Sequence, residues 1–198
     1  MTVVKSSFPP SPNDLYETEE WATQVAINHL KILGFWRNGT VWEPAAGNHK
    51  MVGPLMSAGA KDVLTSDIHT YTKPHNFMFD FLSDDTPAIE GEFDIVGNPP
   101  YGAGNHVARR FAEKALNRCE GYVALLLTAK FDFGSTRLSL FRDCPRFAAQ
   151  VALVDRISWA NNDRTGTEDH AWYIWGPRSF ETDKKLKFYG HNPAKANR

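Results

Sequence analysis

The sequence predicts a single α/β domain built on a doubly wound, mostly parallel sheet. Short apolar runs rich in β-branched residues alternate along the chain with stretches of helical periodicity. The run at 121–128 is apolar throughout, which is typical of a central strand buried on both faces. The 198 residues suffice for one domain with a substantial core and leave no room for a second.

Seven strands and four helices are expected. The first helix should begin at Asp14, which can cap it, and end near Gly34, a residue suited to a C-cap. Further helices are expected at 51–59, 105–118 and 135–141. Strands are expected at the start of 41–48, which then runs into a small-residue loop, at 63–68, within 76–82 as a short strand or the end of one, and at 93–97, 121–128, 150–154 and 170–175. Between the last two strands, 155–169 is polar and should form a mobile surface loop.

Composition limits the setting of the protein. A net charge of −1 gives no global attraction to nucleic acid, so binding of that kind needs a local patch. The chain has no apolar run long enough for a membrane and no apolar leader, which predicts a cytoplasmic protein without a membrane partner. Cys119 and Cys144 should be buried free thiols, and the histidine spacing predicts no metal site. We expect a disordered lead-in at 1–13, one domain at 14–180 and a basic tail at 181–198.

Acidic residues follow three of the expected strands. Glu43, Asp67 and Asp80 lie at or just beyond strand ends, and the carboxyl ends of parallel strands meet at one edge of a sheet. Glu43 is followed by the small residues of 44–48, which let a ligand lie against the backbone. Asp67 comes about 20 residues later, the spacing at which an acid commonly holds the ribose of an adenosine cofactor. Each acid alone is equally consistent with a helix cap or loop, but the ordered set indicates a cofactor site.

The strand at 93–97 ends in Asn98-Pro-Pro-Tyr101. Proline cannot donate to a sheet ladder and fixes φ, so the two prolines end the strand and hold the amide of Asn98 in one geometry beside the ring of Tyr101. The pattern fits either a rigid polar hook for a ligand or a strand-terminating turn with a surface tyrosine.

Val41-Trp-Glu-Pro-Ala-Ala-Gly47 together with Asn98-Pro-Pro-Tyr101 resembles the motifs of S-adenosylmethionine-dependent amino-methyltransferases, in particular the DNA adenine-N6 methyltransferases. The resemblance runs from about Tyr16 to Trp175, so it covers nearly the whole folded chain. It implies a seven-stranded sheet of the Rossmann-like class I methyltransferase type with S-adenosyl-L-methionine as cofactor. It further implies transfer of a methyl group to the N6 amine of adenine in DNA, single- or double-stranded.

The resemblance also implies roles for individual residues. Asn98, Pro99, Pro100 and Tyr101 would be catalytic, with the Asn98 oxygen and the Pro99 carbonyl accepting the hydrogens of the amine and Tyr101 stacking on the base. The implied cofactor contacts are Tyr16, Thr18, Trp21, Glu43, Ala45, Gly47, Asp67, Ile68, Asp80, Phe81 and Asn98. Substrate contacts are expected from Tyr101, Trp159, Arg109 and Arg110, although Trp159 fits a loop anchor equally well and the arginines fit a solvated helix face.

Two departures from the family pattern leave alternatives open. His49 stands where relatives often have glycine, so the loop should take a different conformation or place a polar group near the cofactor. Only 22 residues follow Gly176, which predicts little sequence specificity and recognition through a separate subunit or a homodimer. The alternative functions are the same chemistry on RNA or on a protein glutamine amide, and a non-catalytic partner subunit with the same fold.

Overall fold

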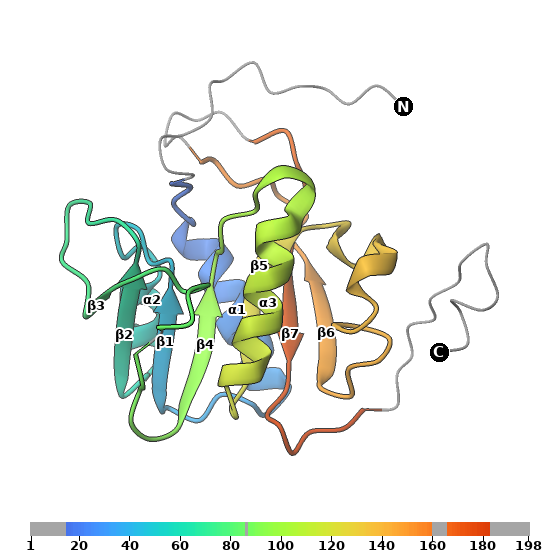
Figure 1. Cartoon of the computed structure of the whole chain (residues 1–198), viewed down its shortest axis with the longest axis horizontal. Coiled ribbons are helices and arrows are strands. Elements are labelled where there is room, and N and C mark those ends of the chain that lie inside the picture. The colour runs from blue at the N-terminus through green and yellow to red at the C-terminus, as the bar shows by residue number, and fades with distance from the viewer. Residues whose placement is uncertain (1–14, 86, 160–165, 183–198) are drawn as a thin grey trace.

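The computed structural model describes residues 15–85, 87–159 and 166–182; the predicted lead-in, most of the basic tail and part of the 155–169 loop lie outside these ranges. The described residues form one seven-stranded sheet in the order β3-β2-β1-β4-β5-β7-β6. The strands are β1 (Thr40–Pro44), β2 (Asp62–Asp67), β3 (Phe77–Met78), β4 (Phe93–Gly97), β5 (Val123–Thr128), β6 (Phe147–Ala152) and β7 (His170–Trp175). Strands β1 to β5 pair in parallel, and β7 is antiparallel to both β5 and β6. The predicted seven-stranded, mostly parallel sheet is confirmed (Figure 1).

Helices cover both faces of the sheet. The helix α3 (His106–Arg118) lies on one face, and α1 (Glu20–Ile32) and α2 (Val52–Ser57) lie on the other (Figure 1). Each layer has its own buried cluster. Along β5, Val123, Leu125 and Leu127 belong to the cluster under α3, whereas Ala124 and Leu126 belong to the cluster under α1. This alternation confirms that β5 is buried on both faces.

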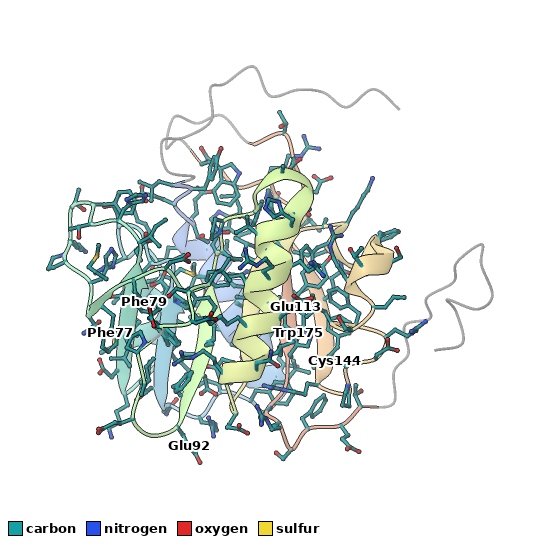
Figure 2. All side chains as sticks on the ribbon, viewed as in Figure 1. Phe77, Phe79, Glu92, Glu113, Cys144 and Trp175 are labelled. Carbon is teal, nitrogen blue, oxygen red and sulfur yellow. The ribbon has the colours of Figure 1, made fainter. Side chains whose placement is uncertain are left out.

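The layer under α3 is rich in aromatic side chains. Trp42, Phe81 and Phe111 pack together there, with ring centroids 5.2 Å apart for Trp42 and Phe81 and 4.3 Å apart for Phe81 and Phe111. Trp175 and Cys144, labelled in Figure 2, belong to the same cluster. Cys144 is a buried free thiol, as is Cys119, which confirms that prediction for both cysteines.

The first helix begins later than predicted. Its expected cap, Asp14, lies outside the described residues, and α1 starts only at Glu20. The chain before it runs along a cavity at the sheet edge, and the Glu19 carboxylate accepts hydrogen bonds from the Trp21 indole (3.1 Å) and the Ser158 backbone N–H (2.8 Å). The predicted end is confirmed, because Gly34 takes a φ of +72° just after the helix.

Two other boundaries were wrong. The expected helix at 135–141 is only a single 3₁₀ turn, Ser135–Arg137, followed by further turns. Here the Arg137 guanidinium donates to the carbonyls of Phe131 (2.7 Å) and Gly104 (3.2 Å), so the segment is held against two neighbouring loops. Strand β6 begins at Phe147, earlier than the predicted 150, with a register irregularity between Phe147 and Ala149. The ring of Phe147 packs against Phe141 at 4.9 Å, which explains why this residue joins the sheet.

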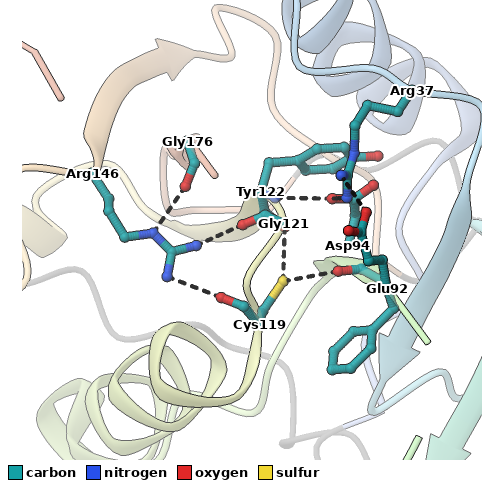
Figure 3. A network of polar contacts seen from close by, with 9 residues as sticks. Arg37, Glu92, Asp94, Cys119, Gly121, Tyr122, Arg146 and Gly176 are labelled. Atoms are coloured by element: carbon teal, nitrogen blue, oxygen red, sulfur yellow. Dashed lines mark hydrogen bonds and ion pairs between the residues drawn. The ribbon is translucent and has the colours of Figure 1, made fainter. Parts of the chain in front are cut away.

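A buried polar network holds the edge of the sheet where β4 and β5 begin (Figure 3). Asp94 of β4 is 1% exposed and accepts hydrogen bonds from the Tyr122 backbone N–H (2.9 Å) and from Arg37 (2.8 Å). A Cβ on Gly121 would lie 2.0 Å from the Asp94 carboxylate, so this close approach requires glycine. Burial raises the pKa of Asp94, an effect that Arg37 and the Tyr122 N–H oppose.

Arg146 lies on the other side of the same network. Its guanidinium donates to four main-chain carbonyls, at distances between 2.6 and 3.0 Å. These carbonyls belong to Leu116, Cys119, Gly121 and Gly176, so a single side chain ties the end of α3 to the start of β5 and the end of β7. The network fixes one edge of the sheet and leaves the opposite edge, where β1, β2 and β4 end, available for a site.

Candidate active site

A cavity of about 570 Å³ opens at the edge where β1, β2 and β4 end. Its wall is built from the segment before α1, the loop after β1, the end of β2, the segment after β3, the end of β4 and the start of α3. Most of the predicted cofactor and motif residues lie in this wall. These are Tyr16, Thr18, Glu43, Ala45, Gly47, Asp67, Ile68, Asp80, Phe81, Asn98 and Pro100. Trp21, Pro99 and Tyr101 are not in the wall.

The loop after β1 is shaped by left-handed backbone conformations. Gly47 has a φ of +51°, and a Cβ there would lie 2.7 Å from the Leu15 side chain, so only glycine fits without movement. The Gly47 N–H donates to Asp67 Oδ2 at 3.0 Å, while Asp67 Oδ1 accepts from the His69 N–H at 3.1 Å. Asp67 therefore braces the loop and lines the cavity at the same time.

His49 takes a left-handed conformation itself, with a φ of +64°. Its Nε2 hydrogen-bonds to His75 Nδ1 at 2.9 Å, and the residue is not part of the cavity wall. Burial, His75 and Lys73 lower the pKa of His49. The polar group that His49 adds is thus directed to the β2–β3 loop, and the backbone keeps a conformation that favours glycine.

Two buried polar groups in the wall lack a partner. Glu43 is 2% exposed, and its Oε2 has no hydrogen bond among the described residues. The hydroxyl of Thr18, which is 3% exposed, also has no hydrogen-bond partner among them. Burial raises the pKa of Glu43 well above its ordinary value, and the nearby Asp67 raises it further. Unpartnered polar groups of this kind are costly unless a ligand satisfies them.

Another part of the cavity wall is apolar with one acid. Phe81 and Phe111 are buried there and Ile68 is 54% exposed, so a flat apolar ligand has a wall to pack against. Asp80 is exposed, and its Oδ1 accepts a hydrogen bond from the Leu82 N–H at 2.8 Å, which leaves Oδ2 available to a ligand donor.

Asn98 lies at the rim, where the segment before α1 crosses β4. Its side-chain nitrogen donates to the Tyr16 carbonyl at 3.1 Å, so the position of the amide is set by a residue 82 positions earlier. Within the described ranges, neither Asn98 Oδ1 nor the Pro99 carbonyl has a hydrogen-bond partner. Two oxygen acceptors close together in the chain are therefore available at the rim.

Beside this rim four aromatic rings form what we call the aromatic cluster: Tyr16, Trp159, His170 and Tyr101. The ring of Trp159 lies 5.7 Å from that of Tyr16 and 5.0 Å from that of His170, and His170 stacks on Tyr101 at 5.9 Å. The Tyr101 hydroxyl donates to the Leu126 carbonyl at 3.2 Å, and burial raises its pKa. The structure thus brings the two predicted base contacts, Tyr101 and Trp159, into one group.

The two predicted arginine contacts lie on α3, outside the cavity wall. Arg109 forms an ion pair with Glu113 at 3.3 Å, and Arg110 is exposed. Over the described ranges, no group of three or more His, Cys, Asp or Glu side chains is arranged to hold a metal ion. None of the helices in these ranges is long and apolar enough to cross a membrane.

Neither the family models nor the curated proteins include a match to this chain, but solved structures do match. A proposed RNA methyltransferase from Pyrococcus horikoshii superposes with a TM-score of 0.63 at 17% identity, over 82% of this chain and 86% of that chain. A proposed class I S-adenosylmethionine-dependent methyltransferase from Listeria monocytogenes gives 0.59 at 10% identity, over 88% and 63%. This chain has the class I methyltransferase fold. The methyltransferase subunit of a type I restriction-modification system from Streptococcus thermophilus also gives 0.59, at 14% identity, over 82% of this chain and 45% of that one.

The cavity of this methyltransferase fold fits S-adenosylmethionine chemically. A cationic, donor-bearing methionine end suits the unpartnered Glu43 and Thr18, and two ribose hydroxyls suit the Asp67 carboxylate. An adenine ring suits the apolar end, where Asp80 can accept from its exocyclic amine.

Several residues of the cavity wall were not predicted. Asn48 donates to Glu17 Oε1 (2.8 Å) and accepts from the Thr72 hydroxyl (2.7 Å), so it joins three segments of the wall. Lys50 lies 3.8 Å from Glu17, and Tyr71 also lines the cavity. The position of Asn48 directly after Gly47 is the one sequence feature that could have predicted its place in the wall. The other residues belong to segments that approach one another only in the folded chain.

Proposed function

We propose that this protein is an S-adenosylmethionine-dependent methyltransferase that methylates the N6 amine of adenine in DNA with little sequence specificity. The observation that carries the proposal is the pair of free acceptors, Asn98 Oδ1 and the Pro99 carbonyl, between a cavity suited to the cofactor and the aromatic cluster. The cofactor assignment is supported by the fold and by the unpartnered polar groups in the cavity.

When bound, the cofactor supplies an electrophilic methyl group on a sulfonium. The protein has to prepare the acceptor, because an amine conjugated to a base ring has a delocalised lone pair and is a poor nucleophile. If Asn98 Oδ1 and the Pro99 carbonyl accept the two amine hydrogens, the nitrogen moves toward tetrahedral geometry and its lone pair is directed to the cofactor. This requires orientation and electrostatics rather than a strong general base.

The aromatic cluster supports a flat acceptor. A base flipped out of a duplex, or taken from a single strand, needs an aromatic surface to replace its stacking, and Tyr101 beside His170 can offer one. The Tyr101 hydroxyl is held by the Leu126 carbonyl, which fixes the orientation of the ring. Trp159 adds a further ring to the same cluster, 5.0 Å from His170.

RNA is a second candidate acceptor. The similarity to the protein from Pyrococcus horikoshii, which is named as an RNA methyltransferase, favours it, whereas the restriction-modification subunit favours DNA. Nucleic-acid recognition by a separate subunit or by a homodimer belongs to the same proposal.

The acceptor can be identified directly. The protein is incubated with methyl-labelled S-adenosylmethionine and with DNA, RNA or protein extract, and the nucleosides and tryptic peptides are analysed by mass spectrometry. We expect N6-methyladenine in DNA. Label confined to RNA nucleosides or to glutamine would overturn the DNA acceptor, and no label in any fraction would overturn the activity.

A further inference from the structure

Glu43 is a carboxyl group without a counter-charge. It lies in the penultimate position of β1 and is 2% exposed, and its Oε2 has no hydrogen-bond partner within the described parts of the chain. A charged carboxylate in such a position has lost its hydration and gained nothing in return, which disfavours the ionised form.

The neighbouring Asp67 has the opposite surroundings. Two backbone N–H groups, from Gly47 at 3.0 Å and His69 at 3.1 Å, donate to its two oxygens. A second negative charge beside it at Glu43 is then repelled. Glu43 thus combines burial, an oxygen without a donor and a neighbouring negative charge, and all three disfavour its ionised form.

We propose that Glu43 is a neutral carboxylic acid in the free protein and releases its proton when the ammonium group of the cofactor's methionine part binds. The proton passes to bulk solvent, and the resulting carboxylate forms an ion pair with the ammonium; no other bond is made or broken. The geometry supports this, because Glu43 lines the cavity and its Oε2 has no other partner. The raised pKa of Glu43 agrees with it. The inference rests on the cofactor part of the proposed function and is independent of the acceptor.

Other titratable groups surround the same cavity, and their contributions to any proton release must be distinguished from that of Glu43. Asp67 ends β2 and His69 follows it, Asp80 follows β3, and Glu17 and Lys50 lie 3.8 Å apart on two further segments of the wall. Outside the wall, His49 is hydrogen-bonded to His75, and the charge of Asp67 raises the pKa of His49 against the larger lowering by burial. A Glu43→Gln variant leaves all of these in place and replaces only the acid by a neutral amide of the same size.

Isothermal titration calorimetry in buffers of different ionisation enthalpy counts the protons released. At a pH below the pKa of free Glu43, the wild-type protein should release about one proton more than Glu43→Gln on binding S-adenosylmethionine. S-Adenosylhomocysteine keeps the ammonium group and should give the same difference, whereas 5′-methylthioadenosine lacks the amino-acid part and should give none. Affinity of the wild type should rise about tenfold per pH unit in this range and then level off.

Equal proton counts for wild type and Glu43→Gln, with S-adenosylmethionine bound, would overturn the inference while leaving the cofactor assignment intact. Absence of binding to both ligands would overturn the cofactor assignment and this inference with it. If Glu43→Gln does not fold, the pH dependence of wild-type affinity decides alone, and a flat profile contradicts the proposal. Methyl transfer to RNA instead of DNA would leave it standing.

Discussion

Substituting Asp67 by alanine tests the double role of this residue as brace and ligand. The change removes the acceptor of the Gly47 N–H (3.0 Å) and of the His69 N–H (3.1 Å) and takes a carboxylate out of the cavity wall. Hydrogen bonds to charged groups contribute about 1.5–3 kcal/mol each, so two lost bonds amount to roughly 3 kcal/mol or more. We expect the free energy of unfolding of the free protein to fall by about 3 kcal/mol.

The affinity of the folded variant for the cofactor should also fall, in addition to the loss of stability. Losing two hydrogen bonds between ribose hydroxyls and a charged group weakens binding by about ten- to a hundredfold. The assays are urea unfolding for stability and calorimetric titration with S-adenosylmethionine for affinity, at a temperature where the variant is folded. Asp62→Ala is the matched control, because Asp62 is an exposed acid at the start of the same strand. Wild-type affinity in folded Asp67→Ala would refute the ribose assignment.

Further substitutions probe the framework of the fold. Arg146→Met leaves four main-chain carbonyls without their donor and should lower the free energy of unfolding by at least about 3 kcal/mol. Arg178→Met, at an ion pair whose arginine is 53% exposed, should lower it by less than about 1 kcal/mol, and similar losses for the two variants in urea unfolding would contradict the network. Burial lowers the pKa of His170 to about 4, so the unfolded chain binds more protons than the folded protein between pH 6.5 and about 4, and stability must fall as the pH falls through this window. Each pH unit below 6.5 costs about 1.4 kcal/mol at this residue. His170→Phe keeps an aromatic ring on Tyr101, and its free energy of unfolding should fall correspondingly less between pH 7 and 5. The same pH dependence in His170→Phe and wild type would count against burial of a neutral imidazole.

The elements that the sequence predicted best are those whose limits are set by local chemistry. Two prolines after Asn98 end β4 where expected, and β7 has the bounds of its apolar run. The helix predicted at 135–141 does not form, and the segment is instead held by Arg137. The two carbonyls to which Arg137 donates, those of Phe131 and Gly104, come together only in the folded chain. Local periodicity cannot anticipate such tertiary contacts.

The candidate site divides in the same way. The acids at strand ends and the glycine loop could be predicted, since the topology of a parallel sheet brings strand ends to one edge. The stacking of His170 on Tyr101 could not, because it depends on β7 running antiparallel, which pairs His170 with Thr128 at the end of β5. The contact between Asn98 and the Tyr16 carbonyl likewise depends on the path of the chain before α1.

The most direct test of the central claim is transfer of a labelled methyl group from S-adenosylmethionine to adenine in DNA by Asn98→Ala. The matched control is Asn117→Ala, an exposed asparagine on α3, and circular dichroism confirms that each variant is folded. Because an oriented acceptor at the reacting amine is worth about 100-fold or more in rate, Asn98→Ala should lose transfer by at least this factor while Asn117→Ala retains it. Undiminished transfer by a folded Asn98→Ala protein would contradict the account.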